Sequence, residues 1–187
     1  MKSVEIMIDE HKNIKRMLKV IRENCLNILK GRDVDFEDFY KVIDFVRNYA
    51  DKHHHNKEEE ILFKYMGETL GDAIKNGPIT GMLIEHDLGR LYIKNLEEAL
   101  GRLKEEKEEA VLDIMTNSMA YAELLHRHID KEDNLIYTFA DARLSEDNKT
   151  IVDDKCMVVE NEAKIKGIQE NYINLLENLE KKVGILK

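Results

Sequence analysis

Apolar residues recur every three or four positions through most of this chain, which is the spacing that places them on one face of an α-helix. Four such stretches predict helices over about residues 3–30, 36–66, 78–107 and 109–143. Ser3 is the predicted N-cap of the first helix, which is expected to end at Gly31, and the second helix is expected to start after Asp35. The segment around Pro78, which is rich in glycine, is the one obvious break, and it joins two helical hairpins.

A fifth apolar stretch follows Ser145 and predicts one further helix to about Lys182. We therefore predict an all-α fold, an up-down-up-down four-helix bundle with an additional C-terminal helix. The predicted domains are a bundle over residues 1–144 and a helical extension over residues 145–187. The extension is expected to pack on the bundle or on a dimer partner.

Each of the four bundle stripes passes through residues of metal-ligand type. The first and third stripes contain one histidine each, whereas the second and fourth contain a histidine and a glutamate one helical turn apart. These candidate ligands are His11, His54, Glu58, His86, His128 and Glu132.

The candidate ligands belong to a pseudo-repeat. M-I-D-E-H ends at His11 and M-L-I-E-H ends at His86, an offset of 75 residues, while His54 and His128 are offset by 74. Burying an unpaired glutamate costs on the order of several kcal/mol, so two glutamates in symmetric core positions require compensation by cations. The sequence therefore predicts a binuclear metal site in the bundle core.

The other histidines are distinguished by their place on the helices. His53 flanks the buried stripe and is the best candidate for an additional ligand. His55 continues the polar row of Arg47 and Asp51, so we expect it to face water. His126 is expected at the surface, because it lies on the opposite side of its helix from His128.

Acidic residues flank the candidate ligands in both halves, namely Glu10, Glu59, Glu85 and Asp133. They are either hydrogen-bond acceptors for ligand imidazoles or solvated charges beside the stripe. Gly89 follows His86 by one turn, where the other half has Ile14. Gly89 thus either leaves space beside the metals or allows two helices to pack closely.

Composition limits the class of partner. The chain has 187 residues, a formal net charge of −9 and a pI near 5.3, which argues against a nucleic-acid partner. The sequence contains no signal-peptide core and no apolar stretch of membrane-spanning length, so no membrane partner and a cytoplasmic location are expected. Cys25 and Cys156 have no metal-site spacing and are expected to be reduced and packed as small apolar residues.

Taken together, the segments E-H-K-N-I, H-H-N-K-E-E-E-I-L-F, I-E-H-D-L-G-R and H-I-D-K-E-D-N-L resemble the hemerythrin-like, or HHE cation-binding, family over roughly residues 1–140. The resemblance implies a four-helix bundle with two non-haem iron ions joined by an oxo or hydroxo group. It implies His11, His54, His86 and His128 as terminal ligands, with Glu58 and Glu132 bridging. Manganese and zinc also accept such donors.

One departure bears on function. Oxygen-carrying hemerythrins have a fifth histidine one turn earlier on the third helix, where this chain has Met82. The four-histidine pattern is more similar to the iron-sulfur-cluster repair branch. We therefore expect a di-iron protein that senses or detoxifies dioxygen, nitric oxide or peroxide, or that donates iron, with a possible redox partner and a monomeric or homodimeric state.

Three alternatives stay open at this level. A reversible oxygen-binding or storage hemerythrin would use a similar centre, and a structural bundle stabilised by metal would use the same ligands in a closed site. A histidine phosphotransfer module is also a helical bundle, but it needs one exposed histidine and leaves the repeated glutamates unexplained. Whether the protein is an enzyme is not decided by the sequence.

Overall fold

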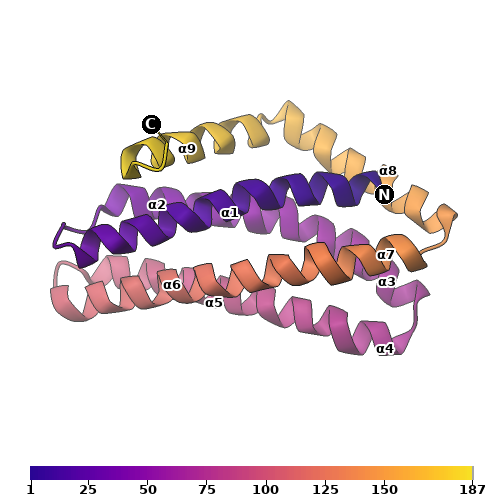
Figure 1. Ribbon diagram of the computed structural model, residues 1–187, viewed down its shortest axis with the longest axis horizontal. Coiled ribbons are helices and arrows are strands. Elements are labelled where there is room, and N and C mark those ends of the chain that lie inside the picture. The colour runs from indigo at the N-terminus through magenta and orange to yellow at the C-terminus, as the bar shows by residue number, and fades with distance from the viewer. Residues whose placement is uncertain (187) are drawn as a thin grey trace.

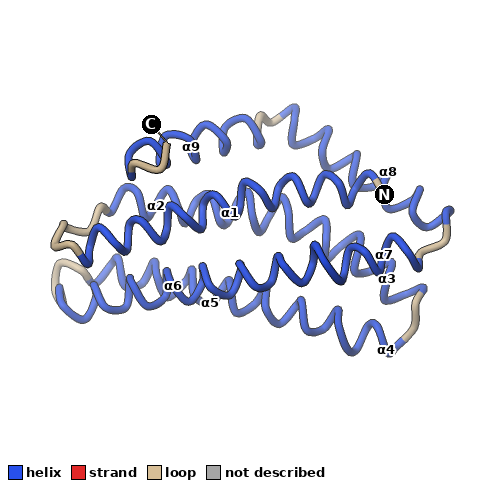
Figure 2. The backbone as a smooth tube through the Cα atoms, in the orientation of Figure 1, coloured by secondary structure: helices blue, strands red, loops and turns tan. Residues whose placement is uncertain are grey.

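The computed structural model describes residues 1–186, and over these residues it consists of helices joined by short loops (Figures 1 and 2). Four long helices run alternately up and down, and a further pair crosses one side of them (Figure 1). The predicted all-α, up-down-up-down bundle with a C-terminal helical addition is confirmed.

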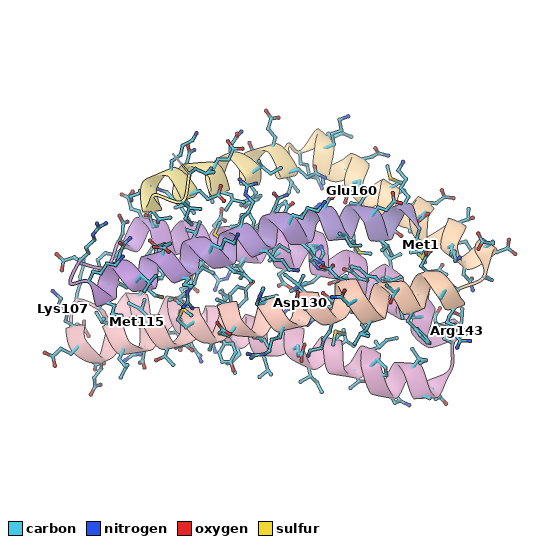
Figure 3. All side chains as sticks on the ribbon, in the orientation of Figure 1. Met1, Lys107, Met115, Asp130, Arg143 and Glu160 are labelled. Carbon is cyan, nitrogen blue, oxygen red and sulfur yellow. The ribbon has the colours of Figure 1, made fainter. Side chains whose placement is uncertain are left out.

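The four bundle helices have the following bounds. The first is α1 (Lys2–Leu29), and the second joins α2 (Phe36–Phe45), η1 (Val46–His55), η2 (Glu58–Phe63) and α3 (Lys64–Thr69). The third joins α4 (Asp72–Ile74), η3 (Lys75–Ile79) and α5 (Thr80–Arg102). The fourth joins α6 (Lys107–Lys131), η4 (Glu132–Ile136) and α7 (Tyr137–Arg143), and Figure 3 labels its two ends, Lys107 and Arg143. The segments labelled η are π-helical, with wider turns than an α-helix.

The helix ends agree with the sequence in two cases and differ in one. Asp35 is the N-cap of α2, where its side chain accepts a hydrogen bond from the backbone N–H of Asp38 at 3.1 Å. Gly31 follows α1 with a φ of 85°, a left-handed conformation that glycine adopts without strain. The prediction that Ser3 caps α1 is wrong, because α1 begins at Lys2 and Ser3 is already inside it.

The C-terminal extension is two helices rather than one. Helices α8 (Glu146–Ile165) and α9 (Ile168–Val183) are separated at Gly167, which has a φ of 66°. Helix α8 begins after Ser145 as predicted, and the Ser145 hydroxyl caps it by accepting from Asn148 N at 3.2 Å. The extension lies along α1 (Figure 1), and Leu176 and Leu179 are buried in the bundle's apolar core.

The bundle core is divided into two apolar clusters. One contains Ile14, Tyr49, Leu96 and Tyr121, among others, and the second contains Met7, Leu62, Met82 and Tyr137. The six candidate ligands are buried as well but belong to neither cluster. A polar layer therefore lies between two apolar layers, and it needs its own electrostatic compensation.

Two smaller expectations can be compared with the structure. Cys25 and Cys156 are buried and free, and burial raises their pKa values to about 11 and about 12, so both thiols stay protonated at neutral pH. Across residues 1–186, the helices include none that is long and apolar enough to cross a membrane.

Candidate metal centre

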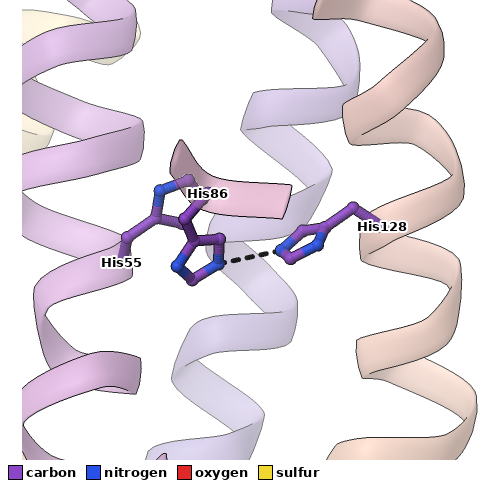
Figure 4. A group of neighbouring side chains, drawn as sticks. All are labelled: His55, His86 and His128. Carbon is purple, nitrogen blue, oxygen red and sulfur yellow. Dashed lines mark hydrogen bonds between the residues drawn. The ribbon is translucent and has the colours of Figure 1, made fainter. Parts of the chain in front are cut away.

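Four imidazoles meet as two pairs in the polar layer. His11 on α1 faces His54 on η1, with 2.9 Å between the two Nε2 atoms. His86 on α5 faces His128 on α6, also with 2.9 Å between the Nε2 atoms (Figure 4). The two pairs correspond to each other in the sequence repeat, in which His11 matches His86 and His54 matches His128.

The outer nitrogen of each of these imidazoles contacts a carboxylate. The Nδ1 atoms of His11, His54, His86 and His128 lie 2.7, 2.7, 2.6 and 2.9 Å from oxygens of Asp133, Glu10, Glu59 and Glu85, in that order. A carboxylate can only accept, so in each neutral imidazole Nδ1 carries the proton and Nε2 keeps a lone pair directed inward. Of the two interpretations of these acidic residues, the structure selects hydrogen bonding to the imidazoles.

Glu58 and Glu132 lie between the two imidazole pairs. Glu132 places one oxygen 3.3 Å from His11 Nε2 and the other 3.0 Å from His128 Nε2. Glu58 Oε2 lies 3.6 Å from Nε2 of both His54 and His86. Each carboxylate therefore reaches toward both pairs, which is the arrangement required of a bridging ligand.

The electrostatics of this layer fit metal ions. Glu58 and Glu132 are fully buried, yet Glu58 Oε2 and both carboxylate oxygens of Glu132 have no hydrogen-bond partner. Burial and the neighbouring Glu132 carboxylate raise the pKa of Glu58 well above its usual value. Burial and the neighbouring His11 imidazole lower the pKa of His54 to about 4, so the lone pair of its Nε2 is available to a metal at neutral pH.

Bound cations would account for both the facing Nε2 atoms and the buried carboxylate oxygens without hydrogen-bond partners. Opposed Nε2 lone pairs and unpaired carboxylate oxygens repel one another, and a cation held between them turns that repulsion into coordination. His11, His54, Glu58 and Glu132 bring ligand atoms within 4.8 Å of one another, and His86 and His128 do so in a second group. Imidazole and carboxylate donors suit iron, and they also accept manganese or zinc.

His55 differs from the sequence-based expectation. It was expected to face water, but its side chain is buried, and its ring stacks on His86 with 3.9 Å between centroids and 10° between planes (Figure 4). The cause is the π-helical segment η1, because a wider turn moves later residues around the helix axis relative to an α-helix. The polar row from Arg47 therefore turns inward before it reaches His55.

His55 belongs by distance to the group of His86 and His128. However, two stacked imidazoles direct their lone pairs side by side rather than toward a common point. In this arrangement His55 forms a wall of the site beside His86. Hydrogen bonding to Asp51 is weak, with 3.4 Å from His55 Nδ1 to Asp51 Oδ1.

His53 joins a different group. Its Nε2 lies 2.9 Å from Glu10 and 3.4 Å from Glu160 rather than near the other imidazoles. The buried ammonium of Lys57 contacts both of these carboxylates. His126 is exposed, as expected. Sequence reasoning missed Lys57 and Glu160, although Lys57 and Lys131 occupy matching positions of the repeat.

Two aromatic residues also occupy matching positions. Tyr137 stacks on His11 with 5.5 Å between centroids, and Phe63 stacks on His86 with 6.1 Å. The Tyr137 hydroxyl donates to Glu58 Oε1, a hydrogen bond that Phe63 has no group to make. The two halves of the centre are thus similar in donors but unequal in surroundings.

A small cavity of about 100 Å³ lies beside His86, between η1, α5 and α6. Its walls include His55, Gly89, Arg90 and Tyr121. The Tyr121 hydroxyl is buried without a hydrogen-bond partner. A Cβ added to Gly89 would lie 3.4 Å from Leu125 Cδ2 and 3.5 Å from Tyr121 Cε2. Gly89 therefore allows close packing against α6 and also borders the cavity.

The fold and the donor set define a class, a helical bundle with a buried cation-binding site of imidazole and carboxylate groups. Residues 2–140 match the hemerythrin HHE cation binding domain. This match covers most of the chain, which therefore belongs to the hemerythrin HHE family. Searches of curated proteins and of solved structures gave no match.

Proposed function

We propose that this chain is a hemerythrin-like protein with two iron ions, one between His11 and His54 and one between His86 and His128. Glu58 and Glu132 would bridge the two ions. The observation that carries this proposal is the set of unpaired, fully buried carboxylate oxygens between two pairs of opposed Nε2 atoms. Iron is favoured by the family and by the donor types.

The cavity beside His86 supports a small ligand rather than a closed structural site. Its volume of about 100 Å³ suits a molecule of two or three heavy atoms, such as dioxygen, peroxide, nitric oxide or azide. Iron in such a centre can exchange electrons with a ligand of this kind at an open coordination position. We therefore propose sensing or detoxification of a small diatomic or peroxide ligand, with iron donation and a redox partner as further roles.

Metal analysis with an optical spectrum tests the proposal. Protein purified without added metal, or reconstituted with ferrous iron, should hold two metal ions per chain. The oxidised iron form should absorb in the visible range, and added azide should change that spectrum. A metal content near zero or one after careful reconstitution would contradict the two-ion centre, and an azide-insensitive spectrum would favour a closed structural site.

A reversible oxygen carrier is the second candidate function. The observation that supports it is the buried position of His55 beside His86. Met82 occupies the position of the fifth histidine, but His55 on η1 supplies a fifth imidazole beside the four candidate ligand imidazoles. His55 is stacked on His86 and is not directed at the metal that His86 would bind. We therefore expect the reduced protein to oxidise in air. A stable oxygenated form that releases dioxygen under vacuum would instead establish a carrier.

A further inference from the structure

Two lysines occupy matching positions behind the two halves of the centre. Lys57 follows His54 by three residues, and Lys131 follows His128 by three. Lys57 donates to Glu10, and Lys131 donates to Glu85. Since Glu10 and Glu85 hold Nδ1 of His54 and His128, each half contains the same sequence of contacts, from lysine to glutamate to imidazole.

The surroundings of these two ion pairs are very different. The Lys57 side chain is 0% exposed, whereas that of Lys131 is 40% exposed. Glu10 is 6% exposed and Glu85 is 21% exposed. One half of the centre is therefore supported by an enclosed ion pair and the other by an ion pair in contact with water.

The C-terminal extension is the cause of this difference. Glu160 lies on α8, beside the bundle (Figure 3), and its Oε1 accepts from Lys57. Gln169 on α9 holds the other Glu160 oxygen at 2.5 Å. His53 completes the cluster by contacting both Glu10 and Glu160. Glu160 and Gln169 lie beyond the family match, which ends at residue 140.

Glu10, His53 and Glu160 have the spacing of a metal site, with ligand atoms within 4.8 Å of one another. The Lys57 ammonium, however, already contacts both carboxylates and supplies the positive charge that a metal would bring. In a buried cluster of this kind, each charge depends on the others, because removing one leaves its partners uncompensated. The cluster is therefore a rigid support for Glu10 and, through it, for the His54 ring.

We propose that Glu160 is a positioning residue for His54, and that α8 makes the two metal positions unequal. A metal held by His11 and His54 would exchange slowly, because Glu10, the acceptor that fixes the His54 ring, is enclosed with Lys57 and Glu160. The metal between His86 and His128 exchanges faster and takes the small ligand, because Lys131 and Glu85 contact water and the cavity opens beside His86. This inference rests on the proposed two-metal function.

Metal release into excess chelator tests the inference on the full chain. Protein loaded with two ferrous ions per chain should release them in a fast and a slow phase of equal amplitude. Glu160→Ala should accelerate the slow phase by about 10- to 100-fold, the range typical of lost outer hydrogen bonding to a ligand, and should leave the fast phase unchanged. Glu160→Gln keeps an oxygen acceptor for Lys57. Its slow phase should therefore be slower than that of Glu160→Ala but faster than that of the parent.

Two control variants separate positioning from general loosening. Lys131→Met removes the matching contact in the other half and should accelerate the fast phase alone. Glu162→Ala removes an exposed glutamate from the same helix and should release metal as the parent does. Far-UV circular dichroism of each loaded variant checks that the bundle is intact.

Three results would overturn the inference. The parent could release both ions in a single phase, Glu160→Ala could release them at the parent's rates, or Glu160→Ala could accelerate both phases equally. A parent that never binds two ions would instead overturn the proposed function itself, so the two failures are distinguishable.

Discussion

Glu10 Oε2 lies 2.7 Å from Nδ1 of His54, although the chain neighbour of Glu10 is His11. The same exchange occurs in the other half, where Glu85, next to His86, contacts His128. Each lone-histidine helix therefore contributes one candidate ligand and also the acceptor that orients a ligand on the neighbouring helix. This crossed pattern makes the helices of each pair depend on one another for the geometry of the centre.

Glu10→Ala should weaken metal binding, because His54 loses the acceptor that fixes its tautomer and ring orientation. We expect a loss of about 10- to 100-fold in affinity, measured by competition with a chelator of known affinity. Glu5→Ala, at an exposed position of α1, is the matched control and should bind metal as the parent does. Equal affinities for all three proteins would show that the hydrogen bond is dispensable.

His55→Ala should leave two metal ions bound and should lower stability. The substitution removes a buried ring stacked on His86, for which we expect a loss of about 1 to 3 kcal/mol in the free energy of unfolding. The enlarged cavity should also let azide bind faster. His126→Ala, at an exposed position, should change none of these quantities. A fall to one metal ion in His55→Ala would mean that His55 is a ligand.

Gly89→Leu should leave both metals in place and weaken azide binding, because the new side chain meets Tyr121 and Leu125 at the edge of the cavity. Gly101→Leu is the control on the same helix, since a Cβ at Gly101 meets nothing within 4 Å. Optical titration with azide measures the effect. Unchanged azide affinity in Gly89→Leu would place the access route elsewhere.

Tyr121→Phe should separate ligand binding from stability. Removal of a buried hydroxyl without a partner should leave the free energy of unfolding unchanged or slightly increased, because no hydrogen bond is lost. Burial raises the pKa of Tyr121, so the hydroxyl stays protonated and can donate to a molecule in the cavity. We therefore expect weaker binding of azide or peroxide, measured by optical titration. Identical ligand affinities in parent and variant would remove Tyr121 from the recognition of ligands.

Asp153→Asn should destabilise the contact between α8 and the start of α1. Asp153 accepts from the backbone N–H groups of Lys2 and Ser3 at 3.0 and 2.9 Å, which would otherwise be free at a helix N-terminus. We expect a loss of about 1 kcal/mol in the free energy of unfolding, measured by urea denaturation. Asp154→Asn, at an exposed position, should have no effect.

The effect of Asp153→Asn should depend on pH in a defined direction. Burial tends to raise the pKa of Asp153, but hydrogen bonds from Ser3 and Lys2 outweigh it and lower the pKa below the usual value of 3.8. The ionised carboxylate therefore stabilises the fold above the usual pKa, and this contribution is lost as the pH falls through the lowered one. The stability difference between parent and variant should shrink in acid, and a difference that is constant with pH would contradict this account.

The sequence by itself determined the helices and the polar positions in their buried faces. Helical periodicity is a local property, and Asp35 and Gly31 set helix ends through contacts within a few residues. The six candidate ligands could be found because they interrupt apolar stripes at matching positions of a repeat. The fold brings them together, while metal ligation itself stays a prediction.

Only the tertiary structure decided which residues contact one another around the centre. His55 is buried because η1 turns more widely than an α-helix, which the apolar spacing of neighbouring residues does not reveal. Glu160 reaches Lys57 across 103 residues of chain, and Asp153 caps α1 across 150. Such contacts depend on which helix faces meet after packing, and the local sequence around each residue does not indicate which faces these are.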